Sequence, residues 1–438
     1  MIEDRVKELG SRNKEEPRKM KDSGVEWIGE IPEEWEIGKV KQAFYRKKAK
    51  AMQENPTILT LARSGVKIRD ISNNEGQLAE SYYNYNPVEE GDFLLNPMDL
   101  YSGANCNVSK VSGVISPAYI NLRARNGFIP QYYDYYFKVQ YWAMALFAHG
   151  RGVSFDNRWT LNNETLMNYY IPIPEMYEQQ AIADYLDSKV ALIDNIIEKT
   201  KQSIEDYKKY KQSLITETVT KGLNPDVEMK DSGIEWIDRI PGHWEIKMLK
   251  YVTKLNQKCL SENTDEDYVF RYVDIGSVSL ENGIERYEKM RFRDAPSRAR
   301  RVVANGDVII STVRTYLKAI TNIRDDSDII VSTGFAVLTP FQVYAKYLEF
   351  FCKCDYFAET VSAHSYGVSY PAINASDILK FKITLPPIEE QQQIADYLDR
   401  KCLQIDKIID QKKTLINELE TYKKSLIYEC VTGKRDVG

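Results

Sequence analysis

The chain lacks the features that mark membrane, secreted and metal-containing proteins. None of its apolar runs approaches the roughly 18 to 20 residues that a membrane-spanning helix requires. Residues 1–20 are charged and contain no apolar stretch like that of a secretory signal. The six cysteines are scattered, and only Cys352 and Cys354 lie close together, without the second pair and nearby histidines of a zinc site. We therefore expect a soluble cytoplasmic protein with no metal and no membrane contact.

An excess of basic charge is also missing. The formal net charge of −5 argues against a protein that coats a polyanion through bulk electrostatics, but it leaves room for local basic surfaces. Such local runs are present at residues 46–50 and between Arg291 and Arg301. Because runs of this kind are often only solvated surface, both interpretations stay open at this point.

What the chain has instead is an internal repeat. The segment Lys21-Asp22-Ser23-Gly24-Val25-Glu26-Trp27-Ile28 returns as residues 230–237 with one substitution, and residues 178–187 return as 390–399 with one substitution. The chain is therefore two tandem copies of one unit, each with a Trp-rich opening segment and a long closing helix. Two linked readers can address two separated places on a partner that itself repeats, and duplex DNA is such a partner.

The opening segments hold four of the six tryptophans, namely Trp27, Trp35, Trp236 and Trp244. In each copy Asp-Ser-Gly provides turn residues, and Pro-x-x-Trp then favours an extended stretch that ends in a large apolar side chain. We expect these indoles to pin each domain onto its helix rather than to bind a ligand.

Each copy continues with short strands, one helix and a loop. Strands are predicted at residues 58–61, 92–95, 269–273 and 308–311, and helices at 132–147 and 344–360. A glycine-containing loop follows, at 148–155 and 363–370, with His149 and His364 at equivalent positions. Between these landmarks the copies diverge, as expected for one scaffold that carries two different contact surfaces.

A long amphipathic helix closes each copy. Apolar positions step by three and four from Ile182 to Thr218, and adding 212 gives the matching positions Ile394 to Cys430. About 45 residues at about 1.5 Å each give a rod of about 65 to 70 Å. We predict that the two helices pack antiparallel, with the domains at opposite ends about a pseudo-twofold axis and the C-terminus near residues 15–24. Association between chains through these helices is the alternative.

The shared motifs resemble those of the specificity (S) subunit of type I restriction-modification systems. The resemblance rests on Lys-Asp-Ser-Gly-x-Glu-Trp-Ile-x-x-Ile-Pro-x-x-Trp in both opening segments. It also rests on Glu-Gln-Gln-x-Ile-Ala-Asp-Tyr-Leu-Asp, which follows Pro174 in the first copy and Pro387 in the second. It covers essentially the whole chain from about Met20.

The resemblance implies an α+β fold, with two similar mixed α/β target recognition domains separated by two long helices that form an antiparallel coiled coil. The implied boundaries are an N-terminal extension at 1–20, recognition domain one at 21–173, the first long helix at 174–222, a linker at 223–229, recognition domain two at 230–386 and the second long helix at 387–433.

The resemblance also implies a function and partners. Each recognition domain is expected to read one half of a bipartite, asymmetric site in double-stranded DNA, while the helices set the gap and dock the partners. Those partners are two methyltransferase subunits, which methylate adenine at N6, and two restriction subunits. S-adenosylmethionine, ATP and Mg are expected in the partner subunits, and no cofactor in this chain. The implied location is the prokaryotic cytoplasm, at the nucleoid.

Motifs for catalysis are missing. The chain has no Asp/Asn-Pro-Pro-Tyr/Phe motif of an amino-methyltransferase, which Asn96-Pro97-Met98-Asp99 resembles only superficially, and no phosphate-binding Gly-x-x-x-x-Gly-Lys-Ser/Thr loop. No carboxylate–lysine cluster typical of a nuclease stands out, and His149 and His364 have no identified acid–base partner. We therefore expect a non-catalytic subunit.

DNA contacts are expected in the divergent loops, because identical loops would read identical half-sites. Arginine and lysine suit phosphates, and polar side chains suit base edges. The candidates in the first copy are Arg46, Lys47, Lys48, Arg63, Ser64, Lys67, Arg69, Asn96, Tyr101 and Arg151. Those in the second are Lys254, Lys258, Arg291, Arg293, Arg298, Arg301, Thr312, Arg314, Tyr316 and Tyr366. For each of them the alternative is an exposed side chain or an intramolecular ion pair.

Other functional hypotheses are kept beside this one. A self-sufficient DNA-modifying enzyme would need the catalytic motifs that the sequence lacks. A coiled-coil adaptor would show no sequence preference on DNA. A methylation-only complex would use the same chain and would differ only in having no nuclease subunit.

Overall fold

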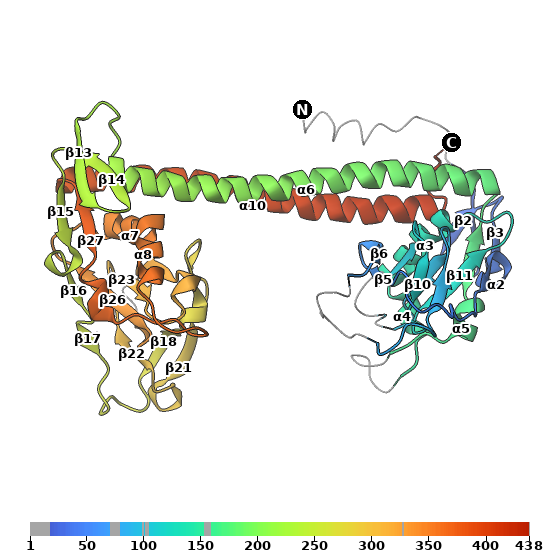
Figure 1. Cartoon of the computed structure of the whole chain (residues 1–438), viewed down its shortest axis with the longest axis horizontal. Coiled ribbons are helices and arrows are strands. Elements are labelled where there is room, and N and C mark those ends of the chain that lie inside the picture. The colour runs from blue at the N-terminus through green and yellow to red at the C-terminus, as the bar shows by residue number, and fades with distance from the viewer. Residues whose placement is uncertain are drawn as a thin grey trace. The chain divides into compact units, whose positions relative to one another are not determined.

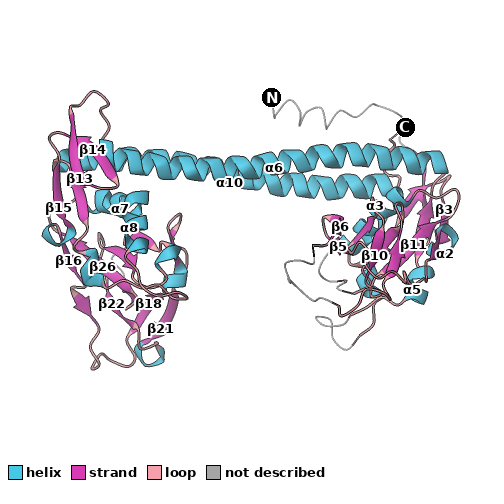
Figure 2. Ribbon diagram, viewed as in Figure 1, coloured by secondary structure: helices cyan, strands magenta, loops and turns pink. Residues whose placement is uncertain are grey.

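The computed structural model describes residues 18–70, 79–98, 100, 105–152, 159–325 and 328–437. The chain forms two compact units, Met1–Lys199 with Leu415–Gly438, and Thr200–Thr414. Two long helices, α6 (Met176–Lys221) and α10 (Ile388–Val431), contribute to both units. Around them each unit is a mixture of short strands and helices (Figure 2). The predicted α+β fold with two long paired helices is confirmed. Among the described helices, none is long and apolar enough to cross a membrane.

The first unit is built on a four-stranded antiparallel sheet, in the order β4 (Phe44–Arg46), β11 (Ile120–Ala124), β8 (Phe93–Leu95) and β9 (Cys106–Val108). Paired strands surround it: β1 (Met20–Asp22) with β2 (Glu30–Pro32), β3 (Glu36–Lys39) with β12 (Tyr170–Ile173), β5 (Leu59–Ala62) with β6 (Gly65–Ile68), and β7 (Asn86–Val88) with β10 (Gly113–Ile115). Its short helices are α2 (Val40–Ala43), α3 (Pro130–Trp142), α4 (Ala145–Ala148) and α5 (Asn163–Met167).

The second unit repeats this sheet as β16 (Thr253–Leu255), β26 (Phe335–Pro340), β23 (Val308–Ser311) and β24 (Ile320–Asn322). Paired strands are β13 (Met229–Ile234) with β14 (Ile237–Pro241), β15 (Glu245–Met248) with β27 (Lys382–Leu385), and β19 (Val278–Ser279) with β20 (Gly283–Ile284). Helical elements are α7 (Ala345–Lys353), α8 (Asp355–Ala363), α9 (Ala375–Ile378), η1 (Leu249–Tyr251), η2 (Ile275–Ser277), η3 (Phe292–Asp294) and η4 (Thr315–Leu317).

A second sheet distinguishes this unit from the described part of the first. It has five strands, in the order β17 (Lys258–Cys259), β22 (Ala299–Val302), β25 (Ile329–Ser332), β18 (Val269–Val273) and β21 (Glu288–Arg291). The two units therefore share the four-stranded scaffold and differ in what is attached to it.

The four predicted strands are confirmed as β5, β8, β18 and β23, but both predicted domain helices are interrupted. In the second unit α7 and α8 are separated at Cys354, whose backbone is extended. The side chains of α6 satisfy the backbone groups at this break: Gln212 Nε2 donates to the carbonyl of Lys353 at 2.6 Å, and Thr216 Oγ1 accepts from the amide of Asp355 at 3.0 Å. Tertiary contacts that sequence periodicity does not report thus decide where the helix ends.

Within each unit the two long helices lie side by side and antiparallel (Figure 1). In the first unit Lys423 Nζ lies 2.5 Å from a carboxylate oxygen of Asp194, and in the second Lys211 Nζ lies 2.7 Å from Asp406. These pairs are equivalent, because adding 212 to 194 and 211 gives 406 and 423. The predicted apolar seam is buried between them, with Leu186 fully covered in the first unit and Leu398 in the second.

The C-terminal end of each long helix is held by the domain of the other copy. Tyr132, from the first copy, donates through its hydroxyl to the carbonyl of Val431 at 2.9 Å, and both groups are buried. Tyr347, from the second copy, donates to the carbonyl of Val219 at 3.2 Å. The last carbonyls of a helix have no partner within it, so these hydroxyls help to satisfy buried groups, and the Val219 carbonyl also accepts from the hydroxyl of Thr384 at 2.8 Å.

Each helix then ends on a glycine against a buried tryptophan. Gly222 (φ +79°) and Gly433 (φ +68°) adopt the left-handed backbone that favours glycine. A Cβ atom on Gly222 would lie 3.1 Å from the indole of Trp244, and one on Gly433 would lie 3.0 Å from Trp35. The end of the chain thus lies beside residues 32–35, just past the predicted 15–24.

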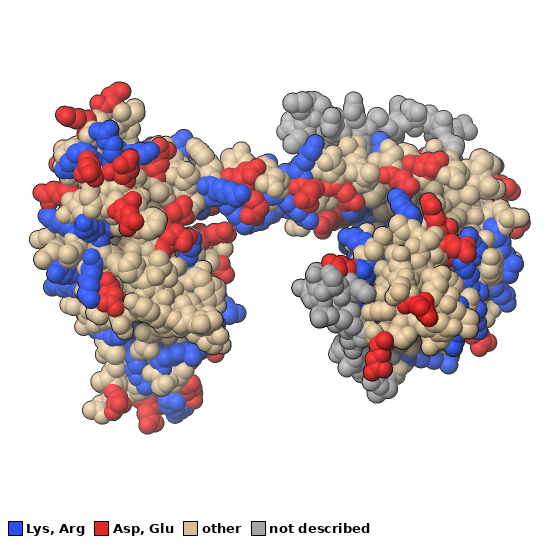
Figure 3. Space-filling model, viewed as in Figure 1, with Lys and Arg blue, Asp and Glu red and all other residues tan. Residues whose placement is uncertain are grey.

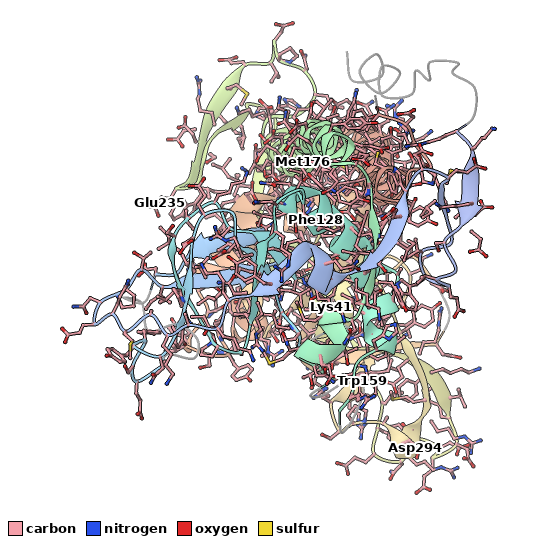
Figure 4. The ribbon with its side chains drawn as sticks, turned by 90° about the vertical axis from the view of Figure 1, so that its right-hand side faces the viewer. Lys41, Phe128, Trp159, Met176, Glu235 and Asp294 are labelled. Carbon is pink, nitrogen blue, oxygen red and sulfur yellow. The ribbon has the colours of Figure 1, made fainter. Side chains whose placement is uncertain are left out.

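The four opening-segment tryptophans do not all pin a domain to its helix. Trp35 and Trp244 do, since both are buried. Trp27 instead packs against His149 and Tyr169, with ring centroids 4.7 and 5.2 Å apart. Trp236 is 69% exposed, because it lies with Glu235, labelled in Figure 4, at the turn between β13 and β14. The expectation was therefore wrong for Trp27 and Trp236.

Glu349 and Asp134 are buried carboxyl groups at equivalent positions of the two units, but their pKa values shift in opposite directions. Glu349 in α7 lies 3.0 Å from Arg324 and 2.8 Å from Lys353. Burial alone would raise the pKa of Glu349, but the two cations outweigh it and hold the pKa below its ordinary value. Asp134 in α3 has one cation, Lys138, at 2.7 Å, and there burial dominates and raises the pKa.

Replacing Tyr347 with phenylalanine should lower the free energy of unfolding by about 1 kcal/mol, because the buried carbonyls of Val219 and Thr384 lose a hydroxyl donor. The Val219 carbonyl keeps a second donor, the hydroxyl of Thr384 at 2.8 Å, which limits the cost. The matched control is Tyr366→Phe, which removes a hydroxyl from a residue that is 82% exposed. Thermal unfolding of the full chain measures both variants. Equal stability of Y347F and wild type would show that the helix end does not depend on this contact.

Glu349→Gln should destabilise the chain by about 2 kcal/mol at pH 7, because Lys353 and Arg324 lose a charged acceptor. A carboxyl whose folded-state pKa is lowered contributes stability above its unfolded-state pKa and loses it as the pH falls through the folded value. The gap between variant and wild type should therefore shrink below about pH 4.5. Asp134→Asn is the comparison and should cost less, since burial already favours protonated Asp134. Melting temperatures from pH 3.5 to 8 test this, and a constant gap for E349Q would refute it.

Candidate nucleic-acid interface

Two loops of the second unit are fastened together by backbone hydrogen bonds. One follows β23, at residues 312–318, and the other follows α8, at 365–373. Tyr366 and Ala372 exchange two backbone hydrogen bonds, both of 2.9 Å, and the amide of Ile373 donates to Thr312 at 2.9 Å. The amide of Arg314 donates to the carbonyl of Pro371 at 2.8 Å. We call this arrangement the loop frame.

In its described residues the first unit contains three of these four hydrogen bonds. Arg151 and Thr160 exchange two backbone hydrogen bonds of 2.9 Å, and the amide of Leu161 donates to the carbonyl of Pro97 at 2.8 Å. Gly150 is required beside it, because a Cβ atom there would lie 2.4 Å from the indole of Trp159. Trp159 is marked in Figure 4. Tyr101, a predicted contact, lies outside the described residues.

The frame of the second unit brings together three of the predicted residues. Arg314, Tyr316 and Tyr366 are all exposed, and the Arg314 guanidinium lies 4.7 Å from the centre of the Tyr370 ring. Arg314 adopts a left-handed backbone (φ +53°), which is strained for arginine and is held by the hydrogen bond to Pro371. Thr312 is buried, and its hydroxyl donates to the carbonyl of Gly334 at 2.8 Å. Thr312 therefore has a structural contact with the turn between β25 and β26.

Sequence reasoning missed Tyr370, which is 61% exposed and supports Arg314. A signal for it was present, because residues 148–155 and 363–370 align, and the aligned residue is aromatic in both copies.

The remaining candidates of the second unit lie mainly on the five-stranded sheet. Arg291 and Arg293 both lie 3.1 Å from Asp267, with each side chain about half exposed. Asp294, which follows Arg293 on η3, is labelled in Figure 4. Lys258 is exposed on the edge strand β17, and Arg301 is half-buried on the neighbouring strand β22.

Arg298 and Lys254 have different surroundings. Arg298 donates to the Tyr272 hydroxyl at 3.1 Å and lies 2.7 Å from Asp274, and these two partners raise its pKa. Lys254 lies on β16, with its ammonium 5.9 Å from the Phe341 ring centre. The candidates of this unit thus occupy the loop frame, the second sheet and the edge of the shared sheet, and they do not form one cluster.

In the first unit two candidates form the turn of a hairpin. Arg63 and Ser64 are exposed between β5 and β6, and Lys67 is exposed on β6. Arg69 is half-buried just after β6. At the end of β4, Arg46 is half-buried, and Lys48, two residues further on, is exposed.

Two candidates of this unit have structural contacts. Lys47 lies 2.9 Å from the fully buried Asp92 and 3.3 Å from Glu89. Arg123 binds the same two carboxylates, so Lys47 belongs to a network that neutralises a buried charge. Asn96 is buried, and its side chain accepts from the amide of Met98 at 2.9 Å.

Both loop histidines pack against aromatic rings. His149 contacts Trp27 and Tyr169, and burial lowers its pKa. His364 Nδ1 lies 2.9 Å from the carbonyl of Thr360, and its ring lies 5.1 Å from that of Phe381. In the described part of the chain, no three His, Cys, Asp or Glu side chains are grouped so as to hold a metal ion. On the face drawn in Figure 3, basic and acidic side chains are interspersed over each unit.

Comparison with known proteins assigns the chain to a family. The profile of the family described as type I restriction modification DNA specificity domain matches residues 32–206 and 241–421, well over half of the chain. The chain therefore belongs to this family. It is a DNA specificity subunit of a type I restriction-modification system, the component that supplies specificity and not catalysis.

Curated relatives match the chain over most of their own length. The chain is 23% identical over 335 residues to the type I restriction enzyme MjaVIII specificity subunit of Methanocaldococcus jannaschii, covering 71% of this chain and 72% of that protein. It is 21% identical over 369 residues to the type I restriction enzyme EcoBI specificity subunit of Escherichia coli, covering 78% and 74%.

Solved structures share the fold. The HsdS subunit from Thermoanaerobacter tengcongensis matches with a TM-score of 0.57 at 16% identity, covering 92% of this chain and 98% of that one. A chain from a study of complex assembly and conformational transition of the type I R-M system matches with a TM-score of 0.69 at 16% identity, covering 92% and 99%.

Arg314→Ala should weaken DNA binding by about 1 to 3 kcal/mol and relax the preference at one base position. We expect this because its guanidinium is exposed and oriented by the Tyr370 ring. Arg239→Ala, an exposed arginine on β14, is the control and should leave affinity and preference unchanged. Binding of the chain, assembled with its modification subunits, to a randomised DNA pool measures both. Unchanged preference in R314A would remove Arg314 from the base-reading residues.

Proposed function

We propose that each unit reads one half of a bipartite, asymmetric site in double-stranded DNA. The observation that supports this most directly is the loop frame, of which three backbone hydrogen bonds recur in the first unit while the side chains on it differ. Tyr366 stands where the first copy has Arg151, and Thr312 stands where it has Pro97. One frame with different side chains suits two readers that must recognise different base sequences.

The proposed DNA contacts fall into two groups, those to bases and those to phosphates. Arg314, Tyr316 and Tyr366 read bases in the second half-site, with Arg151 and the exposed hairpin residues Arg63, Ser64 and Lys67 doing so in the first. Arg291, Arg293, Lys258 and Lys254 bind phosphates, as do Arg46 and Lys48. The ion pairs of Arg291 and Arg293 with Asp267 do not prevent this, because exposed pairs contribute little and a phosphate can replace the carboxylate. Lys47, Asn96 and Thr312 support the scaffold instead.

The long helices have a separate role in this proposal. They set the length of the gap between the half-sites, because α6 and α10 each continue without interruption from one compact unit into the other. Their outer faces dock two methyltransferase subunits, which methylate adenine at N6 with S-adenosylmethionine. Through these subunits the complex recruits two restriction subunits, which use ATP and Mg.

Exchange of residues 25–170 for the same region of another specificity subunit tests the division into halves. The methylated motif should change in one half and keep the other half and the gap length, because the second unit and both long helices are retained. The donor should carry a tyrosine equivalent to Tyr132, so that the end of α10 keeps its contact. Genome-wide mapping of N6-methyladenine in a host that expresses the chain with its partners reads out the motif.

The matched control exchanges residues 234–382 and should change only the other half. A change in both halves from either exchange would contradict reading by separate units. Loss of sequence preference in the wild-type complex would contradict the function itself.

A further inference from the structure

The loop that follows α8 ends in an apolar tip. Val368 is fully exposed (102% of its reference area), and its neighbours Tyr366 and Tyr370 are 82% and 61% exposed. Apolar side chains gain free energy when they leave water, so an exposed group of them usually marks a binding site. We call Tyr366, Val368 and Tyr370 the loop tip.

The loop tip is part of a turn whose backbone conformation is fixed by hydrogen bonds. The two backbone hydrogen bonds between Tyr366 and Ala372 close its base. Gly367 has φ +114°, and a Cβ atom there would lie 3.2 Å from the carbonyl oxygen of Tyr370, so this position requires glycine. The hydroxyl of Thr315 donates to Ser365 at 2.8 Å and ties the turn to the neighbouring loop. Val368 is therefore held outward before any partner binds.

The surroundings of the tip favour nucleic acid over protein as the partner. Arg314 lies on the face of Tyr370, and Tyr316 and Leu317 are exposed on the adjoining η4. Neither segment, 312–318 or 364–374, contains an aspartate or glutamate. Aromatic faces beside an unopposed cation are the groups that stack on bases next to a phosphate backbone.

The sequence of the tip is partly shared between the copies. Gly-Val-Ser followed by an aromatic residue occurs at 152–155 and again at 367–370, while the residue before it changes from Arg151 to Tyr366. Shared side chains cannot distinguish two different half-sites. They suit a task that both half-sites can share, such as opening one flexible step, and the changing residue is left to read bases.

We propose that Val368, flanked by Tyr366 and Tyr370, inserts between two adjacent base pairs of the half-site bound by the second unit and unstacks that step. This rests on the proposed function and adds a mechanism to it. Apolar wedges of this kind kink duplex DNA, and pyrimidine–purine steps open most easily. The second unit therefore selects a flexible step, TA or CA/TG, at a position where it makes no base-edge hydrogen bond.

Fluorescence of 2-aminopurine, which rises when the base loses its stacking partners, tests this. The probe replaces purines one at a time across the second half-site, and the chain is assembled with its modification subunits. Wild type should raise the fluorescence several-fold at one step only. Val368→Ser should abolish this rise, weaken binding about ten-fold and reduce the preference for a flexible step there. Because Val368 is fully exposed, the variant should keep the wild-type melting temperature.

Leu223→Ser, a change from an exposed apolar residue in the linker after α6, is the matched control and should behave as wild type. If the complex binds its site specifically but no position gains fluorescence, or if V368S keeps the signal, the wedge is refuted while the proposed function stands. If V368S instead impairs assembly with the modification subunits and leaves the signal intact, the tip is a protein contact. Absence of sequence-specific binding by wild type would overturn both proposals.

Discussion

The burial of each long helix's last turn in the domain of the other copy is the contact on which the fold depends. Tyr132 and Tyr347 bind the final carbonyls, Gly433 and Gly222 turn the chain, and Trp35 and Trp244 close over the turn. Neither copy can complete its core alone, because the apolar cluster around Tyr347 includes Ile215 and Val219 from the helix of the first copy. The two copies are thus obligatory partners within one chain. This explains why the opening and closing motifs are the parts that repeat.

Divergence between the copies is confined to what the scaffold carries. The four-stranded sheet, the helix pair beside it and the loop frame recur, and even the buried acid of the first domain helix has an equivalent in the second copy. The charges around that acid do not recur, since Glu349 has two cations and Asp134 has one. The five-stranded sheet of the second unit brings its own basic residues. The surface that we propose meets DNA can therefore change while the support beneath it stays the same.

Much of the fold could be predicted from the sequence. The duplication, the antiparallel helices, the strands and the approximate place of the C-terminus follow from repeats and periodicity, which local sequence records directly. The break at Cys354 does not, because side chains of α6, more than 130 residues earlier in the chain, provide the hydrogen-bond partners of its backbone. The exposure of Trp236 does not either, since the same motif packs inward around Trp27. Among the candidate contacts, Arg314, Tyr316 and Tyr366 meet on one surface. Lys47 was misleading, because its partner Asp92 lies 45 residues away in the sequence.

The loop frame also bears on how new specificities arise. Its bridging residues enclose residues 152–159 in one copy and 367–371 in the other, so loops of different length fit the same hydrogen bonds. Since those bonds join backbone atoms, loops of other lengths and side chains can share the closure, except at positions such as Gly367 that require glycine. Small changes of sequence in this loop can therefore alter what it contacts while the scaffold beneath it is kept.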